Sequence, residues 1–324
     1  MNLESLPRVK LAALPTPLQE LPRLSKLLGR RLWIKRDDLT GLAEGGNKTR
    51  KLEFLCADAL RCGADTLVTV GAPQSNHCRQ TAAAAAALGL RSVLVLTGSP
   101  RPPETGNLLL DVLVGANLVW AGERPRDAAL EETLAGEKSA GRNPYRIPYG
   151  GSNPLGAAAY ALAIREIKEQ GMEPDWIVFA SSSGGTQTGL ILGARQYGFT
   201  GRIQGISVDL PSDPLREKIL ALAADTMQKM NVAGSAAQEI LHIDDRFRGG
   251  GYGVAGDLER EAIRLFARQE GILLDPVYTG RAAGGMLEMI RRDEIPSGAS
   301  ILFWHTGGTP AVWAYAKELL EGEM

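Results

Sequence analysis

The strongest constraint on the fold is an alternation of short apolar runs, rich in β-branched residues, with longer segments of helical pattern along most of the 324 residues. Runs that are apolar throughout are typical of strands buried on both faces, as in parallel sheets covered by helices. The sequence therefore predicts an α/β protein with open, mostly parallel sheets and helices on both faces. The predicted strands are 33–36, 66–70, 92–96, 117–120, 176–180, 203–208, 272–274 and 300–304.

The length indicates about two domains, each large enough to bury its own core. One plausible arrangement folds residues 52–156 as a small inserted α/β domain and residues 1–51 plus 157–324 as the large domain. The glycine-rich turn 149–154 would then be a crossing point. An alanine tract at 82–87 predicts a buried helix, because alanine has a high helix propensity and its small side chain allows close packing.

The charge balance excludes several classes of partner. Lys and Arg number 36 against 37 Asp and Glu, which leaves a formal net charge of -1 and no electrostatic case for nucleic acid or an anionic membrane. We expect a small-molecule partner instead. No secretory signal pattern is visible, and no apolar run reaches the roughly 18 residues of a membrane span, so we expect a cytoplasmic protein. Three cysteines without Cys-x-x-Cys spacing and three scattered histidines predict no metal site.

A glycine pair at 45–46 precedes Lys48, which lies at a predicted helix start downstream of the strand 33–36. A lysine in such a position can form an imine if its amine is deprotonated. A nearby cation lowers the pKa of an amine, and Lys51 lies one helical turn further on. The alternative is a basic, solvated helix start that follows a glycine turn.

A second glycine-rich segment, 181–189, follows the strand 176–180 and precedes a helical pattern. Gly184 and Gly185 would let the backbone approach an anion, and the hydroxyls of Ser183 and Thr186 would add contacts at the positive end of the helix. The segment lacks the Walker lysine and the Gly-x-Gly-x-x-Gly spacing, so neither a nucleotide triphosphatase nor a dinucleotide enzyme is supported. A flexible strand-to-helix turn is the alternative interpretation.

Polar residues also follow the strand 66–70. Ser75 is a natural N-cap for the alanine-rich helix, and Asn76 offers both a donor and an acceptor, so the pair could hold a carboxylate or a ring hydroxyl. Capping alone would equally explain both residues. We expect His77 to be a polar contact more than a catalyst.

Two tyrosines lie in loops that could carry function. Tyr252 stands among glycines at 249–253, and Tyr278 follows the predicted strand 272–274. A phenol can relay protons when a neighbour lowers its pKa. Each tyrosine could instead be a core residue with a solvated hydroxyl. A third glycine-rich strand end occurs at 306–309.

Taken together, these segments resemble the fold-type II pyridoxal-phosphate (PLP) enzymes related to the tryptophan synthase β subunit. Within them the chain is similar to the D-cysteine desulfhydrase and 1-aminocyclopropane-1-carboxylate deaminase group. The resemblance covers nearly the whole chain and implies a cofactor in the cleft between two domains and a homodimer. The segments that carry it are 14–18, 34–38, 45–53, 74–77, 275–278 and 305–308.

The resemblance implies a role for each matching residue in cofactor binding. Lys48 would hold PLP as an imine, Asn76 would bond its ring hydroxyl, and Thr306 falls where the family contacts the pyridine nitrogen. A neutral hydroxyl at that nitrogen need not keep the ring protonated, which we expect to favour elimination over transamination. The phosphate would be cradled by Gly184, Gly185 and Thr186, with added charge from Lys51.

The resemblance also implies substrate contacts. Ser75, with the neighbouring amides of Asn76 and His77, would bind the substrate carboxylate. Tyr252 and Tyr278 would flank the substrate, with Thr279 as a further substrate contact. Deaminases of the group that open the cyclopropane ring carry glutamate directly after the second tyrosine and leucine before the last Gly-Gly. This chain has Thr279 and Thr306 at these positions, as in the desulfhydrase pattern.

The resulting prediction is PLP-dependent α,β-elimination of D-cysteine to pyruvate, hydrogen sulfide and ammonia. Lys48 or Tyr278 would remove the Cα proton, and the sequence does not choose between them. L-Cysteate sulfo-lyase activity is the alternative on the same scaffold, and 1-aminocyclopropane-1-carboxylate deaminase activity is a weaker one. A non-catalytic amino-acid or nucleotide binder is the rival from another class, and it predicts no imine. A serine hydrolase has little support, because no Gly-x-Ser-x-Gly elbow is present.

Overall fold

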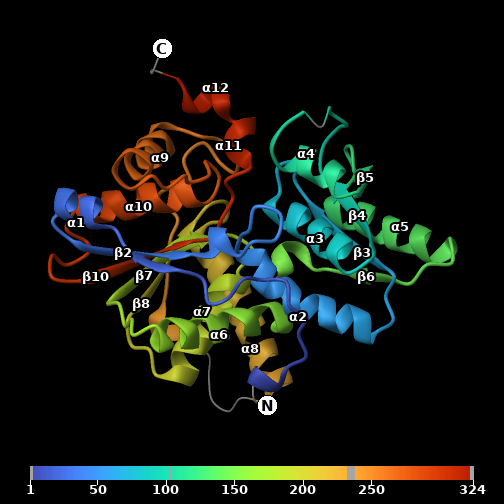
Figure 1. Cartoon of the computed structure of the whole chain (residues 1–324), viewed down its shortest axis with the longest axis horizontal. Helices are drawn as coiled ribbons and strands as arrows, with labels where there is room; N and C mark the ends of the chain where they lie inside the picture. The colour runs from blue at the N-terminus through green and yellow to red at the C-terminus, as the bar shows by residue number, and fades with distance from the viewer. Residues whose placement is uncertain (1–2, 103, 232–237, 322–324) are drawn as a thin grey trace.

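Two open sheets organise the computed structural model, which describes residues 3–102, 104–231 and 238–321. They lie side by side in Figure 1. Every strand pair is parallel except the antiparallel pair at one edge of the larger sheet. In spatial order the larger sheet contains β1 (Leu18–Glu20), β2 (Arg31–Arg36), β10 (Ser300–His305), β7 (Trp176–Ser181), β8 (Arg202–Ser207) and β9 (Leu241–Asp244), and the smaller contains β5 (Asn117–Trp120), β4 (Arg91–Leu96), β3 (Thr66–Gly71) and β6 (Pro144–Arg146).

The predicted strands correspond to β2, β3, β4, β5, β7, β8 and β10, with one exception. The prediction of a strand at 272–274 is wrong, since this segment pairs with no strand in the part of the chain that the structure describes. Ile272 and Leu274 are buried in the core, which accounts for the apolar pattern. The Leu273 carbonyl lies 3.0 Å from Nε2 of the His305 side chain, outside any sheet ladder. Three further strands, β1, β6 and β9, were not predicted and are three or four residues long.

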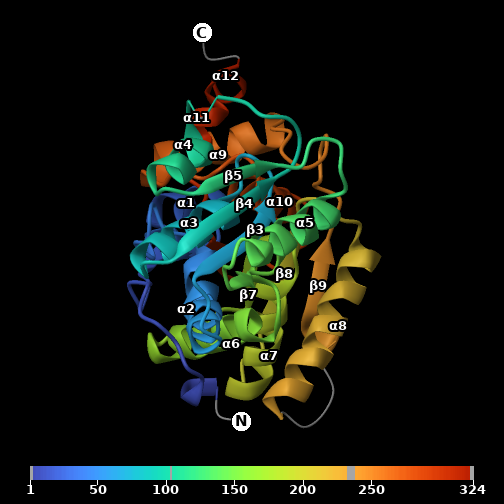
Figure 2. The same cartoon turned by 90° about the vertical axis from the view of Figure 1, so that its right-hand side faces the viewer.

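Helices cover both faces of each sheet. Side chains alternate along β7, so that Val178 packs towards α1, α9 and α10 while Phe179 packs towards α6, α7 and α8. Figure 2 views the molecule from the side of the smaller sheet, which packs against α2, α3 and α4 on one face and α5 on the other. The helices are α1 (Pro22–Leu28), α2 (Asn47–Arg61), α3 (Asn76–Ala87), α4 (Gly106–Leu113), α5 (Arg126–Ser139), α6 (Pro154–Glu169), α7 (Gly185–Tyr197), α8 (Ser212–Met230), α9 (Asp257–Glu270), α10 (Thr279–Arg291), α11 (Ala311–Ala314) and α12 (Ala316–Leu319), with short 3-10 turns η1 (Leu3–Ser5), η2 (Asp37–Leu39), η3 (Tyr149–Gly151) and η4 (Gln238–Ile240).

The α/β class with mostly parallel sheets is confirmed, and the alanine tract does form a buried helix, α3. All strands of the smaller sheet lie between residues 66 and 146, inside the proposed small domain 52–156. The proposed limits fall within α2 and α6, so these two helices join the sheets, and the domain limits stay a proposal. In the described ranges, no helix is both long and apolar enough to cross a membrane.

A buried cluster of charged and polar groups fixes the helix that carries Lys48. The Arg50 guanidinium donates to both carboxylate oxygens of Asp37, at 2.9 and 2.8 Å, and also pairs with Glu166 of α6 at 2.8 Å. The Tyr160 hydroxyl and the Trp304 indole nitrogen donate to Asp37 at 2.5 and 2.8 Å. Three chain segments, α2, α6 and β10, thus converge on a single carboxylate, which is fully buried.

Candidate active site

A cavity between the two sheets collects most of the predicted site residues. Its walls come from the carboxyl ends of β3, β7 and β10, where ligands of open α/β sheets bind, together with the start of α2 and the turn η3. No Asp or Glu lines it within the described ranges. The lining residues are Asn47, Lys48, Ala72, Ser75, Asn76, His77, Tyr149, Gly150, Ala180, Ser181, Ser182, Ser183, Gly184, Thr186, Tyr252, Tyr278 and Thr306.

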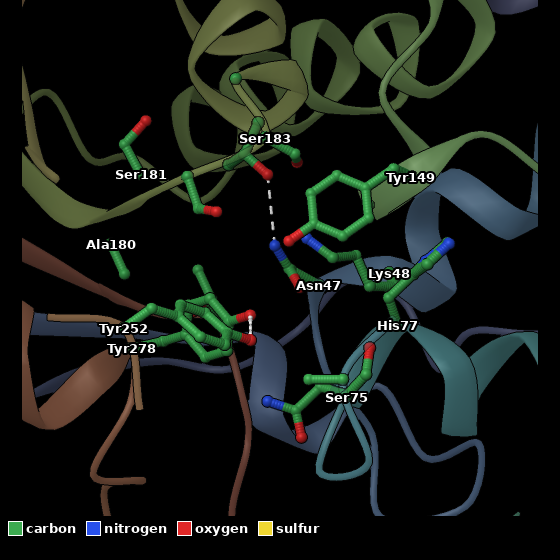
Figure 3. Close-up of a pocket in the computed structure, with 17 residues that line it drawn as sticks. Asn47, Lys48, Ser75, His77, Tyr149, Ala180, Ser181, Ser183, Tyr252 and Tyr278 are labelled. Carbon is green, nitrogen blue, oxygen red and sulfur yellow. Dashed lines mark hydrogen bonds between the residues drawn. The ribbon is translucent and has the colours of Figure 1, made fainter. Parts of the chain in front are cut away.

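Lys48 extends its amine into this cavity (Figure 3). Gly46, at φ 127°, makes the sharp entry into α2 that a residue with a side chain rarely adopts. The Asn47 amide, which starts the helix, donates to the Thr306 carbonyl at 2.9 Å and so joins it to the end of β10. Loss of hydration lowers the pKa of Lys48 to about 8, from an ordinary value of 10.5. About a tenth of this amine is therefore neutral and nucleophilic at pH 7, against well under a thousandth for an ordinary lysine.

Lys51 lies behind the cavity wall and is fully buried. Its Nζ donates to the Gly150 carbonyl at 3.1 Å, and no carboxylate pairs with it among the residues described. Burial, with a further contribution from the charge of Lys48, lowers the pKa of Lys51 well below its ordinary value. Its amine lies close to the start of α7, because a Cβ on Gly185 would be 3.0 Å from Nζ. An anion at that helix start would stabilise the charged form of Lys51.

The start of α7 has the geometry of an anion cradle. The N-cap Gly184 has φ 88° and no side chain to satisfy the first amides of the helix. Ser152 accepts from the Gly185 amide at 3.1 Å and donates to Ser183 at 2.7 Å, so hydroxyls surround the helix start. A Cβ on Gly185 would lie 2.5 Å from the Ser152 hydroxyl. The amides of the helix start, the hydroxyls and a lysine together suit the phosphate of PLP.

The polar residues after β3 form the opposite wall. The Ser75 hydroxyl accepts from the Cys78 amide at 3.2 Å, which confirms Ser75 as the N-cap of α3. Asn76 accepts through its Oδ1 from Asn107 at 2.9 Å, so its side-chain nitrogen can donate to a ligand. His77 pairs through Nε2 with the Thr69 hydroxyl at 2.8 Å, and burial lowers the pKa of His77 well below its ordinary value. A neutral imidazole held in this way is a polar contact.

Tyr252 and Tyr278 meet on one side of the cavity (Figure 3). Their hydroxyl oxygens are 2.6 Å apart, and the rings pack edge to face with centroids 5.9 Å apart. Burial raises the pKa of both phenols above the ordinary value, and Tyr278 is shifted well above it. Both phenols are therefore protonated near neutral pH, and the pair can donate one hydrogen bond to a ligand.

Three predicted site residues do not line the cavity. Lys51 and Gly185 lie directly behind the cradle, but Thr279 is turned away. The Thr279 hydroxyl donates to the Asp275 carboxylate at 2.7 Å and accepts from the Asp275 amide at 2.8 Å. Its side chain is fully buried, so a direct contact of Thr279 with substrate does not fit this structure.

The sequence prediction missed two cavity residues of note. Asn47 donates from Nδ2 to the Thr186 hydroxyl at 3.2 Å and so joins the Lys48 helix to the cradle. Tyr149 also lines the cavity, and the Arg126 guanidinium lies 4.4 Å from the centroid of its ring. The motif 45–51 contained Asn47 and the crossing turn 149–154 contained Tyr149, but neither pattern assigned a role to the side chain.

An amine-bearing lysine opposite an anion cradle, between two parallel sheets, defines a PLP-binding site of the fold-type II class. The chain belongs to the family of pyridoxal-phosphate dependent enzymes, which matches residues 9–307. Its cofactor is therefore pyridoxal 5'-phosphate. Within the described ranges, no group of three or more His, Cys, Asp or Glu side chains is placed to hold a metal ion.

Solved structures agree with this assignment. A crystal structure of an ACC deaminase homologue shares 40% identity over 98% of this chain and 97% of its own, with a TM-score of 0.91. Threonine deaminase isoform 2 from Solanum lycopersicum, in its processed form, has 18% identity and a TM-score of 0.70 over 96% of this chain and 83% of its own. An L-serine ammonia-lyase from Rhizomucor miehei has 19% identity and a TM-score of 0.69 over 98% and 99%. The last two show the shared fold.

Substitution Gly185→Ala is expected to weaken PLP binding. The added methyl group would lie 2.5 Å from the Ser152 hydroxyl and 3.0 Å from its Cα, so the cradle would have to shift at a cost of about 1–3 kcal/mol. Titration of the cofactor-free protein with PLP measures the change. Gly136→Ala is the matched control, since a Cβ there meets nothing within 4 Å. An unchanged dissociation constant for the Gly185 variant would contradict the phosphate assignment.

The capture of PLP by Lys48 is expected to depend on pH with a midpoint near 8. Only the neutral amine attacks the aldehyde, and a pKa of about 8 leaves roughly 300-fold more neutral amine at pH 7 than an ordinary lysine would have. The capture rate should therefore rise up to about pH 8 and then level off. Stopped-flow absorbance between pH 6 and 10 tests this, and a midpoint near 10 would show that burial does not activate Lys48.

Proposed function

We propose that this protein is a PLP-dependent carbon-sulfur lyase that converts D-cysteine and water to pyruvate, hydrogen sulfide and ammonia. When bound, PLP withdraws the electrons left at Cα after a proton is removed. The Cβ–S bond then breaks, and the sulfur leaves with its electron pair. The protein has to bind the substrate carboxylate, move one proton and release the sulfur.

The observation that carries the proposal is the lining of the cavity, which has no carboxylate in the described part of the chain. A thiol of pKa about 8.5 leaves as a stable anion without added protonation, whereas a hydroxyl group needs an acid stronger than the Tyr252 and Tyr278 phenols, whose pKa values are raised by burial. The cavity thus supports loss of a sulfur group more readily than loss of water. The absence of negative charge also favours binding of the substrate carboxylate beside Ser75 and Asn76.

Lys48 is the residue best suited to remove the Cα proton. Its pKa of about 8 makes it an effective base near neutral pH. Tyr278 is less suited, because burial raises the pKa of this phenol well above its ordinary value and keeps it protonated. We assign Tyr252 and Tyr278 to a hydrogen-bonding role beside the substrate, which their contact at 2.6 Å supports.

Two other substrates remain candidates. L-Cysteate carries a sulfonate that would leave as sulfite, again without an added proton, and the same carboxylate-free lining favours it. The second candidate is 1-aminocyclopropane-1-carboxylate, whose ring would be opened, because the 40% identical structure is that of an ACC deaminase homologue. Thr279 stands where the resemblance places glutamate for that reaction, and its hydroxyl is bound to Asp275, so ring opening has less support.

A substrate panel tests the proposal. The PLP-loaded protein is given D-cysteine, L-cysteine, L-cysteate and 1-aminocyclopropane-1-carboxylate, and pyruvate, sulfide, sulfite and 2-oxobutyrate are measured. Equal amounts of sulfide and pyruvate from D-cysteine are expected. Sulfite from L-cysteate without sulfide from D-cysteine would overturn the assignment, as would 2-oxobutyrate alone. The Lys48→Arg variant controls for reactions of free PLP.

A further inference from the structure

Arg79 is a fully buried arginine of α3 that reaches the segment leading to Lys48. Its guanidinium donates to the carbonyls of Ala43 and Gly45, the latter at 3.0 Å. Both of these residues have positive φ, 40° for Ala43 and 60° for Gly45. For a residue with a side chain, such as Ala43, this conformation persists only where surrounding contacts hold it, whereas glycine adopts it freely. Arg79 supplies such contacts three and five residues before Lys48.

The same guanidinium reaches the opposite wall of the cavity through one intermediate side chain. Arg79 Nε donates to Asn107 Oδ1 at 2.6 Å, and Asn107 Nδ2 donates to Asn76 Oδ1 at 2.9 Å. Asn107 is fully buried, and Gln74 fixes it by accepting from its backbone amide at 2.8 Å. Because Asn107 occupies Oδ1 of Asn76, the side-chain nitrogen of Asn76 is left to donate to a ligand.

The charge of Arg79 is not explained by an ion pair. Its donors contact two carbonyls and Asn107, and the nearby carboxylate of Asp111 is fully buried without a hydrogen-bond partner among the described residues. Burial raises the pKa of Asp111 to about 8, so much of it is protonated near neutral pH. A buried arginine is costly to keep without a full counter-charge, and its bonds to the two cavity walls are the contacts that offset this cost.

We propose that Arg79, acting through Asn107, is a positioning residue that holds Asn76 and the Lys48-bearing segment at a fixed spacing. One rigid, planar group bonds to both sides, so the lysine and the amide that face the cofactor cannot drift apart independently. The proposal rests on the PLP site and not on the identity of the substrate. Its test therefore uses cofactor binding in the absence of any amino acid.

The test compares Arg79→Lys with the matched variant Arg281→Lys. Arg281 is also fully buried, and it donates to Glu259 and to the carbonyls of Val208, Gly251 and Val254 beside Tyr252. Because Tyr252 is assigned to the substrate and not to PLP, weaker support of its loop should not change cofactor affinity. Titration of cofactor-free protein with PLP gives the dissociation constant, and urea unfolding gives the stability of each variant. We expect the dissociation constant to rise about tenfold or more for Arg79→Lys and to stay within about twofold for Arg281→Lys.

Equal PLP affinity of Arg79→Lys and the parent protein would overturn the proposal. The proposal would also be overturned if PLP affinity and stability fell in parallel, and equally, in both variants. That result would show that Arg79 has a merely structural role. If Arg79→Lys does not fold, Asn107→Ala carries the test, since it cuts the bond to Asn76 and leaves the contacts with Ala43 and Gly45. It should raise the dissociation constant and shift the absorbance maximum of bound PLP, and no change in either would refute the link.

Discussion

Replacing Lys48 by alanine is expected to lower the rate of elimination by on the order of 10⁴-fold or more, because the variant loses both its covalent hold on the cofactor and its base. The visible absorbance of covalently bound PLP should disappear as well. Spectra of the purified protein and assays of pyruvate release measure the two losses separately.

Two control variants sharpen this experiment. Lys48→Arg keeps the positive charge but cannot form an imine, so it should be as inactive as Lys48→Ala. Lys26→Ala removes an exposed lysine of α1 and should leave both readouts unchanged. Full activity in Lys48→Ala would refute the assignment of Lys48. A colourless parent protein that is indifferent to added PLP would refute the cofactor site itself.

Replacing Asp37 by alanine is expected to lower the free energy of unfolding by about 3–5 kcal/mol. The substitution removes the acceptor of the Tyr160 hydroxyl and the Trp304 indole, and it leaves the buried Arg50 with Glu166 as its remaining carboxylate. Unpaired buried donors and an under-compensated charge each carry a large penalty. Urea unfolding of the PLP-free protein measures the loss.

The matched control for Asp37 is Asp225→Ala. Asp225 forms an exposed ion pair with Lys229 at 3.3 Å, four residues along α8, and such pairs contribute only about 0.5 kcal/mol. Similar stabilities of the two variants would show that the buried cluster does not hold the segments together. A large loss confined to Asp37→Ala would confirm that the cluster anchors the helix carrying Lys48.

The sequence predicted those parts of the site that follow a strand end. Lys48, Ser75 and Thr186 lie near glycines or helix starts after buried strands, and parallel strands bring such ends to one edge of a sheet. These residues could therefore be found from short sequence patterns, namely a strand followed by glycines or a helix start. That these segments come together between two sheets was predicted only from the resemblance to PLP enzymes.

The remaining features depended on contacts that no local pattern contains. Tyr149 comes from the crossing turn η3 and not from a strand end, so the same rule does not find it. Thr279 follows Tyr278 in sequence, but α10 begins there, and successive helical side chains point about 100° apart. The failed strand at 272–274 shows that burial of Ile272 and Leu274 alone does not define a strand.

The burial of Lys51 makes the cofactor-free form of the protein less stable than the PLP-bound form. Its amine has no carboxylate partner among the described residues, so the cofactor-free form retains an uncompensated cost at the start of α7. A bound dianion would remove that cost and would add the linkage stabilisation of any ligand that binds only the folded state. Molecules that have not acquired PLP would unfold more often and be degraded first, so proteolysis would enrich the population in loaded enzyme.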